Sequence, residues 1–259
     1  MPARKILAIN GSYRGEKGQT HFLLEELFRG ARTAGGECEE IVLARHKINR
    51  CLACDECHSP EHPLECAYAR RDEVASIFKK MMVADLLIYA TPTYIFGISG
   101  LMKIFIDRMN STSNTRAFRI TRSGLFFHHI NPELCSKPFA VLICCDNLDA
   151  EMPRSTLAYF RAYAKFMDAP LVGTLVRNGG SLASSTKSLS DKHVQARLAE
   201  IHAAYRQAGE ELASSGRIHS RTQNLANREI IPLPLFGILK HWLPFKRVMV
   251  ERAKEMLTP

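Results

Sequence analysis

The feature that most constrains the fold is a short apolar run, followed by a loop rich in glycine and hydroxyl groups and then by an amphipathic segment. Residues 4–10 read Arg-Lys-Ile-Leu-Ala-Ile-Asn, which predicts a buried strand. The apolar residues between Phe22 and Ala31 recur at helical spacing and predict a helix over 19–34. A strand that runs through a short loop into a helix is typical of α/β folds with a parallel sheet.

The loop itself, residues 11–20, reads Gly-Ser-Tyr-Arg-Gly-Glu-Lys-Gly-Gln-Thr and ends where the helix begins. Free backbone N–H groups and the positive end of the helix dipole attract anions at such a position. The hydroxyls of Ser12 and Thr20 suit a phosphate monoester, although the loop matches neither a Walker A motif nor a dinucleotide motif. The alternative is an ordinary turn in which Thr20 caps the helix.

The rest of the chain alternates between strand and helix patterns, which predicts a parallel sheet covered on both faces. Five such strands allow the doubly wound order 2-1-3-4-5, in which the ligand lies outside the carboxyl ends of the strands, between the loops after the first and third. A segment from Asn110 to Lys137 interrupts the alternation, either as a cover for this crevice or as a surface excursion. The predicted strands are 4–10, 37–44, 85–91, 138–145 and 170–177, and the predicted helices are 19–34, 72–84, 97–109, 152–167 and 190–214.

Composition indicates a protein with a full core, since 46% of its 259 residues are hydrophobic. No run approaches the roughly 20 uncharged apolar residues of a membrane-spanning helix, and Met1-Pro-Ala-Arg-Lys is unlike a signal peptide. We therefore expect a cytoplasmic protein. The net charge of +9 is concentrated from Arg217 onward, without an aromatic-interleaved basic patch, so we expect no nucleic-acid partner.

A second motif makes the assignment more specific. Residues 91–108 read Thr-Pro-Thr-Tyr-Ile-Phe-Gly-Ile-Ser-Gly-Leu-Met-Lys-Ile-Phe-Ile-Asp-Arg. Together with the opening loop, this segment closely resembles the NADPH-dependent FMN reductase family of flavodoxin-like proteins, and the resemblance covers residues 4–178. The matching residues are Gly11, Ser12, Arg14, Gly18 and Thr20 in the first motif and Pro92, Tyr94, Ser99, Lys103, Asp107 and Arg108 in the second.

The resemblance implies a flavodoxin-like fold and an FMN site. Residues 92–97 would pass along the isoalloxazine ring, and Asp146 would border it, either turned away or in contact with ribityl hydroxyls. Because the flavin itself carries the redox chemistry, we assign no catalytic residue. Lys103, Asp107 and Arg108 would serve in helix-surface ion pairs and packing. The implied cofactor-binding residues are Ser12, Arg14, Gly18, Gln19, Thr20, Pro92, Thr93, Tyr94, Ile95, Phe96, Gly97 and Asp146.

Four of the eight cysteines are concentrated in one segment, at Cys51, Cys54, Cys57 and Cys66. The C-x₂-C-x₂-C spacing with a further cysteine is typical of a [4Fe–4S] cluster, and the iron–sulfur flavoprotein branch of the family carries a compact motif here. The spacing before Cys66 is longer than in that branch. Two alternatives stay open: a metal-free loop that packs a dimer or the flavin pocket, and zinc bound by these cysteines with His58 or His62. We assign no function to Cys38, Cys135, Cys144 and Cys145.

The chain is thus predicted to be an FMN-dependent oxidoreductase that takes a hydride from NAD(P)H and passes electrons to a quinone, a small oxidant or a protein. The alternatives are an iron–sulfur flavoprotein that carries electrons with ferredoxin, and an FMN-binding redox sensor or interaction protein. We divide the chain into a flavodoxin-like FMN-binding domain over 1–189, with a Cys-rich loop over 46–70 and an insertion over 110–137, and a helix and apolar, basic tail over 190–259. The tail favours a homodimer or homotetramer over contact with a membrane surface.

Overall fold

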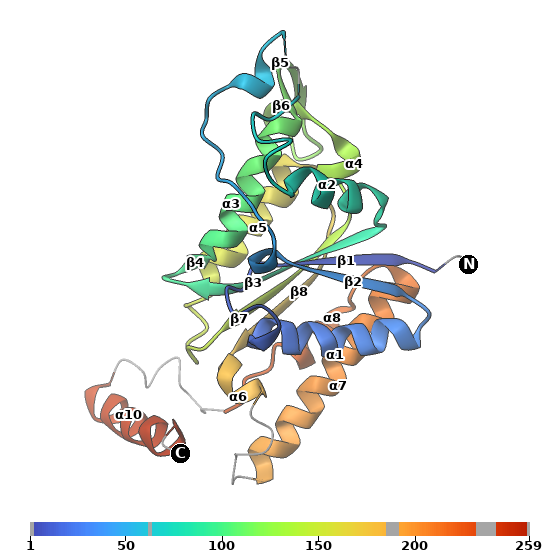
Figure 1. Ribbon diagram of the computed structural model, residues 1–259. Helices are drawn as coiled ribbons and strands as arrows, with labels where there is room; N and C mark the ends of the chain where they lie inside the picture. The colour runs from blue at the N-terminus through green and yellow to red at the C-terminus, as the bar shows by residue number, and fades with distance from the viewer. Residues whose placement is uncertain (1–2, 62–63, 185–191, 232–241, 258–259) are drawn as a thin grey trace.

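The computed structural model describes residues 3–61, 64–184, 192–231 and 242–257. Its centre is a six-stranded sheet whose parallel strands follow the order β2-β1-β3-β7-β8 (Figure 1). In chain order these are the predicted strands one to five, so the predicted flavodoxin-like order 2-1-3-4-5 is confirmed. The parallel strands are β1 (Lys5–Asn10), β2 (Glu37–Val42), β3 (Leu86–Tyr94), β7 (Phe139–Cys145) and β8 (Leu171–Asn178), and β4 (Gly97–Ile98) pairs antiparallel with the end of β3.

Helices cover both faces of the sheet (Figure 1). The apolar stripes of these helices and the continuous apolar runs of β3 and β7 bury one another in two clusters, one on each side. Helix α7 follows residue 189, where we divide the chain, yet it packs on α1 in the same core. One face carries α1 (Gln19–Thr33), α6 (Gly180–Ser184) and α7 (Lys192–Ser215), and the other carries α2 (Val74–Val83), α3 (Gly100–Asp107) and α5 (Arg154–Phe166).

Side chains from a short helix cover the outer edge of β8. Helix α8 (Ser220–Ala226) runs along this edge. The Gln223 side-chain carbonyl accepts from the Thr174 N–H at 2.7 Å, and that of Asn227 accepts from the Val176 N–H at 2.7 Å. These side-chain amides bond backbone groups of β8 that a neighbouring strand would otherwise bond. This edge of the sheet is therefore not free to pair with another chain.

Helix α3 begins later than its sequence pattern predicts. We expected a helix over 97–109, but residues 97–98 turn back and pair with β3. Ser99 then caps the helix by accepting from the Met102 N–H at 3.1 Å. Residues 97–98 therefore form part of a hydrogen-bonded turn, although their apolar character would fit a helix equally well.

The interrupting segment forms a hairpin that packs at the far end of α5. Strands β5 (Ser113–Ile120) and β6 (Phe126–Ile130) are followed by the short helix α4 (Pro132–Cys135). Arg119 pairs with Asp168, and the Phe127 and Phe166 rings lie 5.2 Å apart. Because the C-terminal end of α5 leads into the start of β8, the hairpin lies away from the carboxyl ends of the strands. Of the two alternatives for this segment, the structure shows the surface excursion and not the cover over the crevice.

The tail is described only in part, since residues 232–241 lie outside the described residues. Helix α10 (Leu243–Leu257) stands apart from the sheet in Figure 1. Its described side chains include Leu243 at 61% and Val248 at 54% exposure. Within the described ranges, no helix combines the length and the apolar character needed to cross a bilayer.

We expect Gly209→Ala to destabilise the fold. A Cβ at Gly209 would lie 1.8 Å from the Leu27 carbonyl oxygen, and one at Gly30 would lie 1.7 Å from that of Arg206, so α1 and α7 touch through their backbones. Forcing the helices apart should lower the free energy of unfolding by about 2 kcal/mol, even though alanine favours helix. Urea unfolding measures the change. The control is Gly97→Ala, where nothing lies within 4 Å of the added Cβ. Equal stability of the two variants would contradict the prediction.

Candidate functional site

We call the loop between β1 and α1, residues 11–18, the anion loop. A side chain at the end of β1 and a backbone hydrogen bond within the loop fix its shape. The Asn10 side-chain carbonyl accepts from the Ser12 N–H at 2.8 Å, and the Gly15 N–H donates to the Ser12 carbonyl at 3.1 Å. Ser12 is 2% exposed. A Cβ on Gly18 would lie 2.8 Å from Ser12 Oγ, so only glycine fits here without displacing that hydroxyl.

Helix α1 begins at the end of this loop without a side-chain cap. Its N-cap is Gly18, and the first α-helical bond runs from the Phe22 N–H to the Gly18 carbonyl at 3.2 Å. The N–H groups of residues 19–21 come before that bond and have no partner within the helix. The alternative in which Thr20 caps the helix is wrong, because Thr20 lies inside it. The helix start and its dipole are therefore open to an anion.

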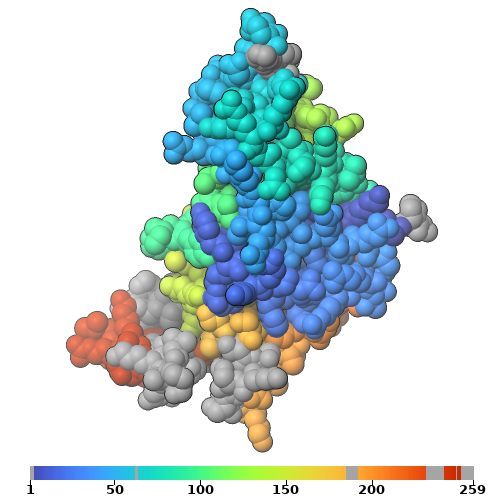
Figure 2. Space-filling model, viewed as in Figure 1, coloured from blue at the N-terminus to red at the C-terminus, as the bar shows by residue number. Residues whose placement is uncertain are grey.

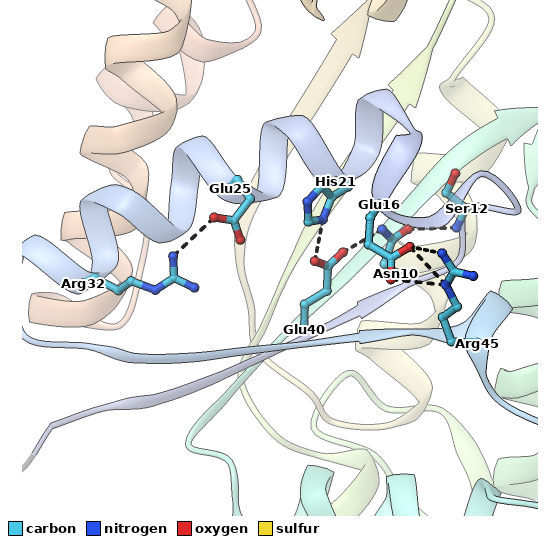
Figure 3. Close-up of polar contacts among 8 residues, drawn as sticks. All are labelled: Asn10, Ser12, Glu16, His21, Glu25, Arg32, Glu40 and Arg45. Atoms are coloured by element: carbon cyan, nitrogen blue, oxygen red, sulfur yellow. Dashed lines mark hydrogen bonds and ion pairs between the residues drawn. The ribbon is translucent and has the colours of Figure 1, made fainter.

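A largely buried carboxylate ties the anion loop to its neighbours (Figure 3). Glu40 Oε1 accepts from Asn10 Nδ2 at 2.7 Å, and Glu40 Oε2 lies 2.7 Å from His21 Nδ1. This network connects the ends of β1 and β2 to the first turn of α1. Sequence reasoning missed all three residues. Only Asn10, at the end of a buried strand and directly before Gly11, offered a signal.

A second contact in Figure 3 holds the middle of the loop. Arg45 Nη2 donates to Glu16 Oε2 at 2.8 Å, and Arg45 Nε donates to the same oxygen at 3.1 Å. This hydrogen-bonded ion pair lowers the pKa of Glu16 to about 2. Among the described residues, the Arg14 guanidinium has one acceptor: its Nη1 donates to the neutral Gln19 side chain at 3.2 Å. Arg14 can therefore meet an anion, whereas the charge of Arg45 is already balanced.

The turn after β3, residues 94–97, is apolar and strained; we call it the aromatic turn. Ile95 and Phe96 have φ values of +44° and +65°, which L side chains rarely adopt. Their side chains are 85% and 64% exposed, and the Tyr94 ring stacks on that of Tyr13 with centroids 6.3 Å apart. Strained backbone that presents exposed apolar groups is typical of ligand-binding turns.

Loop and turn meet at the edge where β1 and β3 end. The Ser99 hydroxyl donates to the Gly11 carbonyl at 2.6 Å, and the Gly11 N–H donates to the Ala90 carbonyl at 2.8 Å. A Cβ on Gly11 would lie 2.8 Å from the Met102 Cβ. The structure thus brings the two predicted motifs into direct contact.

Three of the predicted cofactor-binding residues have partners inside the protein. Pro92 and Thr93 are buried within β3, and Thr93 Oγ1 lies 3.2 Å from Thr156 Oγ1. Asp146 Oδ1 accepts from the Ser181 N–H at 2.8 Å and from its hydroxyl at 2.6 Å. The Asp146 carboxylate is therefore engaged at the start of α6.

The four clustered cysteines lie in the Cys-rich loop over 46–70. The described part of this loop reaches the upper tip of the molecule in Figure 2. All four cysteines line one cavity of about 20 Å³. Burial and then the neighbouring thiols, Cys66 foremost, raise the pKa of Cys57. Cys57 is buried, Cys51 and Cys66 are half-buried, and Cys54 is exposed.

Arg108, at the end of α3, contacts several parts of this loop. It is 2% exposed, its Nη1 donates to the Asn49 carbonyl at 2.9 Å, and it pairs with Asp72. Its Nη2 lies 3.1 Å from Cys66 Sγ, and its guanidinium carbon lies 5.5 Å from the centre of the Tyr68 ring. One side chain therefore holds both ends of the loop and one of its thiols.

The charged residues of the second motif lie in two different environments. Lys103 and Asp107 form the expected ion pair on the surface of α3. Arg108 does not lie at the surface. Sequence reasoning assigned it only ion pairs and packing and missed its contact with the cysteines, because the Cys-rich loop is remote in sequence.

The cysteine arrangement bears on which metal could fit. Among the described residues, no three His, Cys, Asp or Glu side chains are placed to hold a single metal ion, and His62 lies outside them. A zinc ion requires ligands at about 2.0–2.3 Å from one point, so the described part of the loop has no preformed zinc site. A [4Fe–4S] cluster binds one thiolate at each of four irons, which suits four cysteines around a common cavity. The cavity of about 20 Å³ would have to expand to admit a [4Fe–4S] cluster.

Comparison with known proteins gives the class. The NADPH-dependent FMN reductase family matches residues 4–128. An iron-sulfur flavoprotein from Archaeoglobus fulgidus is 36% identical over 104 residues, which is 40% of this chain and 48% of that protein. A Bacillus subtilis protein named as an NAD(P)H-dependent FMN-containing oxidoreductase is 32% identical over 108 residues, 42% of this chain and 53% of that protein. The chain spans about half the length of the curated relatives it matches.

Residues 4–128 match the model of the NADPH-dependent FMN reductase family, so the resemblance seen in the two motifs is confirmed. The fold of the chain is also similar to that of an FMN-dependent NADH-azoreductase from Bacillus anthracis, solved in complex with FMN. That similarity has a TM-score of 0.57 and covers 82% of this chain and 100% of the other, at 13% sequence identity. At this identity it shows the fold alone.

We expect Glu16 to stay ionised far below the ordinary pKa of a glutamate. Because the hydrogen bond from Arg45 lowers its pKa from 4.5 to about 2, the ion pair stabilises the fold above 4.5 and is lost as the pH falls through about 2. Side-chain carboxyl NMR should place the midpoint near 2. Arg45→Met should raise it, whereas Arg154→Met, which removes a cation paired with Glu151, should not. An unmoved midpoint in Arg45→Met would contradict the assignment.

We expect Arg108→Met to loosen the Cys-rich loop without unfolding the sheet. The change removes the hydrogen bonds to Asn49 and Cys66 and leaves the Asp72 carboxylate, which is 0% exposed, without its charged partner. Hydrogen exchange should rise in residues 46–70 and stay unchanged in β1 and β7. The matched control is Lys103→Met on the exposed side of the same helix. Equal exchange in the two variants would show that Arg108 does not hold the loop.

Proposed function

We propose that this protein binds FMN at the carboxyl edge of the sheet and is an oxidoreductase that uses NAD(P)H. The observation that carries the proposal is the contact between the anion loop and the aromatic turn. Tyr13 of the loop stacks on Tyr94 of the turn, and Ser99, two residues after the turn, donates to the Gly11 carbonyl. A phosphate-sized anion site and an exposed apolar surface are held together in this way. The family match spans both segments.

The donor groups fit FMN. Residues 19–21 offer backbone N–H groups at the start of α1, and Ser12 and Thr20 add hydroxyls. Arg14 adds a positive charge that no carboxylate of the described ranges balances. Tyr94 and Phe96 offer apolar surface to the ring system. When bound, FMN takes up the hydride of NAD(P)H and delivers two electrons to an acceptor. The chain contributes position and charge, and we assign no side chain to proton transfer.

We expect Ser12→Ala and Thr20→Ala each to weaken FMN binding by roughly tenfold or more. A hydrogen bond to a charged group contributes about 1.5–3 kcal/mol, and 1.4 kcal/mol is a factor of ten. Quenching of flavin fluorescence measures the affinity. Thr33→Ala, at the other end of α1, is the control and should bind FMN normally. Unchanged affinity in both loop variants would refute the phosphate assignment.

Activity then separates the candidate roles. Oxidation of NADPH or NADH by the FMN-loaded protein, with a quinone as acceptor, would support the enzyme. Reduction only by ferredoxin would favour an electron carrier, and no turnover with either would favour a redox sensor or interaction protein.

We also propose a homodimer or homotetramer, supported by the exposed apolar side chains of the aromatic turn and α10.

A second proposal is that the Cys-rich loop holds a [4Fe–4S] cluster through Cys51, Cys54, Cys57 and Cys66. The supporting observation is that all four thiols line one cavity, with the Arg108 guanidinium beside Cys66. Cationic N–H donors to sulfur stabilise the negative charge of a thiolate-bound cluster.

We expect protein purified without oxygen to contain about four irons per chain. Cys54→Ser should remove the iron and leave the sheet folded, because Cys54 is exposed. Cys38→Ser is the matched control outside the loop and should keep it. Iron and sulfide analysis with circular dichroism makes the measurement. Iron-free wild-type protein would refute the cluster and leave FMN binding untouched.

A further inference from the structure

Arg177 carries a buried charge with no opposite charge beside it. It lies near the end of β8 and is 1% exposed. Its Nη2 donates to the Arg228 carbonyl at 2.6 Å, whereas its Nε and Nη1 have no hydrogen-bond partner in the described part of the chain. Among the described residues, no carboxylate pairs with it. Burying a guanidinium without an opposite charge raises the free energy of the folded state, and a bound anion would offset this.

The groups around Arg177 do not supply that anion. The ionisable side chains that influence it are the Tyr205 phenol and the Cys144 thiol. Burial raises the pKa of Cys144 to about 12 and also raises that of Tyr205, so both are neutral at pH 7. The Tyr205 hydroxyl is itself buried, and no residue that the structure describes hydrogen-bonds to it. The immediate surroundings of the guanidinium therefore hold unused donors, and neither Tyr205 nor Cys144 supplies a negative charge.

A pocket of about 240 Å³ adjoins Arg177. Its walls are mostly apolar, with Leu148 from the loop after β7, Val176 from β8, and Ile230. Asn178 also lines the pocket, but its amide already donates to the Leu148 and Asp149 carbonyls. The Asn227 amide, also in the lining, is bonded to the backbone of β8. Among the described lining residues, Arg177 is therefore the cation with unused donors.

We propose that this pocket binds a small organic monoanion, with a carboxylate held by Arg177 and an apolar body against Leu148, Val176 and Ile230. The exposed carboxylate of Glu229 also lines the pocket and would repel a second negative charge, which favours a monocarboxylate over a phosphate. The site is distinct from the proposed FMN site, because its lining within the described residues includes neither the anion loop nor the aromatic turn.

The test is calorimetric titration of the full chain, saturated with FMN, with benzoate and with its uncharged analogue benzamide. Benzoate should bind at least tenfold more tightly than benzamide. Arg177→Met should weaken benzoate binding at least tenfold, and Glu229→Gln should tighten it. Arg228→Met is the matched control: it removes a neighbouring surface cation that pairs with Glu200, and benzoate binding should not change.

Two further variants keep the test decisive. Ala150 is exposed at the rim of the pocket, so Ala150→Trp should fill it and abolish benzoate binding with Arg177 intact, even if Arg177→Met fails to fold. Ser12→Ala should leave benzoate binding unchanged, which separates this site from the anion loop whether or not FMN binds there. The proposal is overturned if wild-type protein does not bind benzoate, or if binding survives both Arg177→Met and Ala150→Trp.

Discussion

The hydrogen bond from the Ser99 hydroxyl to the Gly11 carbonyl, 2.6 Å long, joins the parts of the chain on which the proposed function depends. Ser99 also caps α3, and Gly11 approaches that helix so closely that a Cβ would collide with Met102. The close approach positions the anion loop beside the aromatic turn. Without it, an anion site and an apolar surface would lie on separate loops with no fixed spacing between them.

Helix α3 extends this organisation to the second group of candidate residues. It begins beside the anion loop and ends at Arg108, which holds the Cys-rich loop through Asn49, Asp72 and Cys66. At 1.5 Å per residue, eight residues span about 12 Å, so the two candidate sites lie at opposite ends of one short helix. A rigid helix of this kind keeps the distance between them constant, which an electron-transfer role would require.

Much of the fold could be predicted because β3 and β7 are continuous apolar runs that only a sheet covered on both faces can bury. The errors occurred where local patterns are ambiguous. The apolar residues after Tyr94 fit a helix as well as a turn, and pairing with β3 decided between them. The hairpin over 113–130 gave no sign of its destination, because its anchor, Asp168, is remote in sequence.

The sequence by itself determined the alternation of strands and helices, the two motifs and the cluster of four cysteines, since each depends on the spacing of residues close together in the chain. Only the tertiary structure decided which side chains serve these motifs. Glu40 behind the anion loop, Arg108 beside Cys66 and the unpaired charge of Arg177 all depend on contacts between distant segments. Burial and charge pairing are properties of the packed molecule, and no local pattern of residues encodes them.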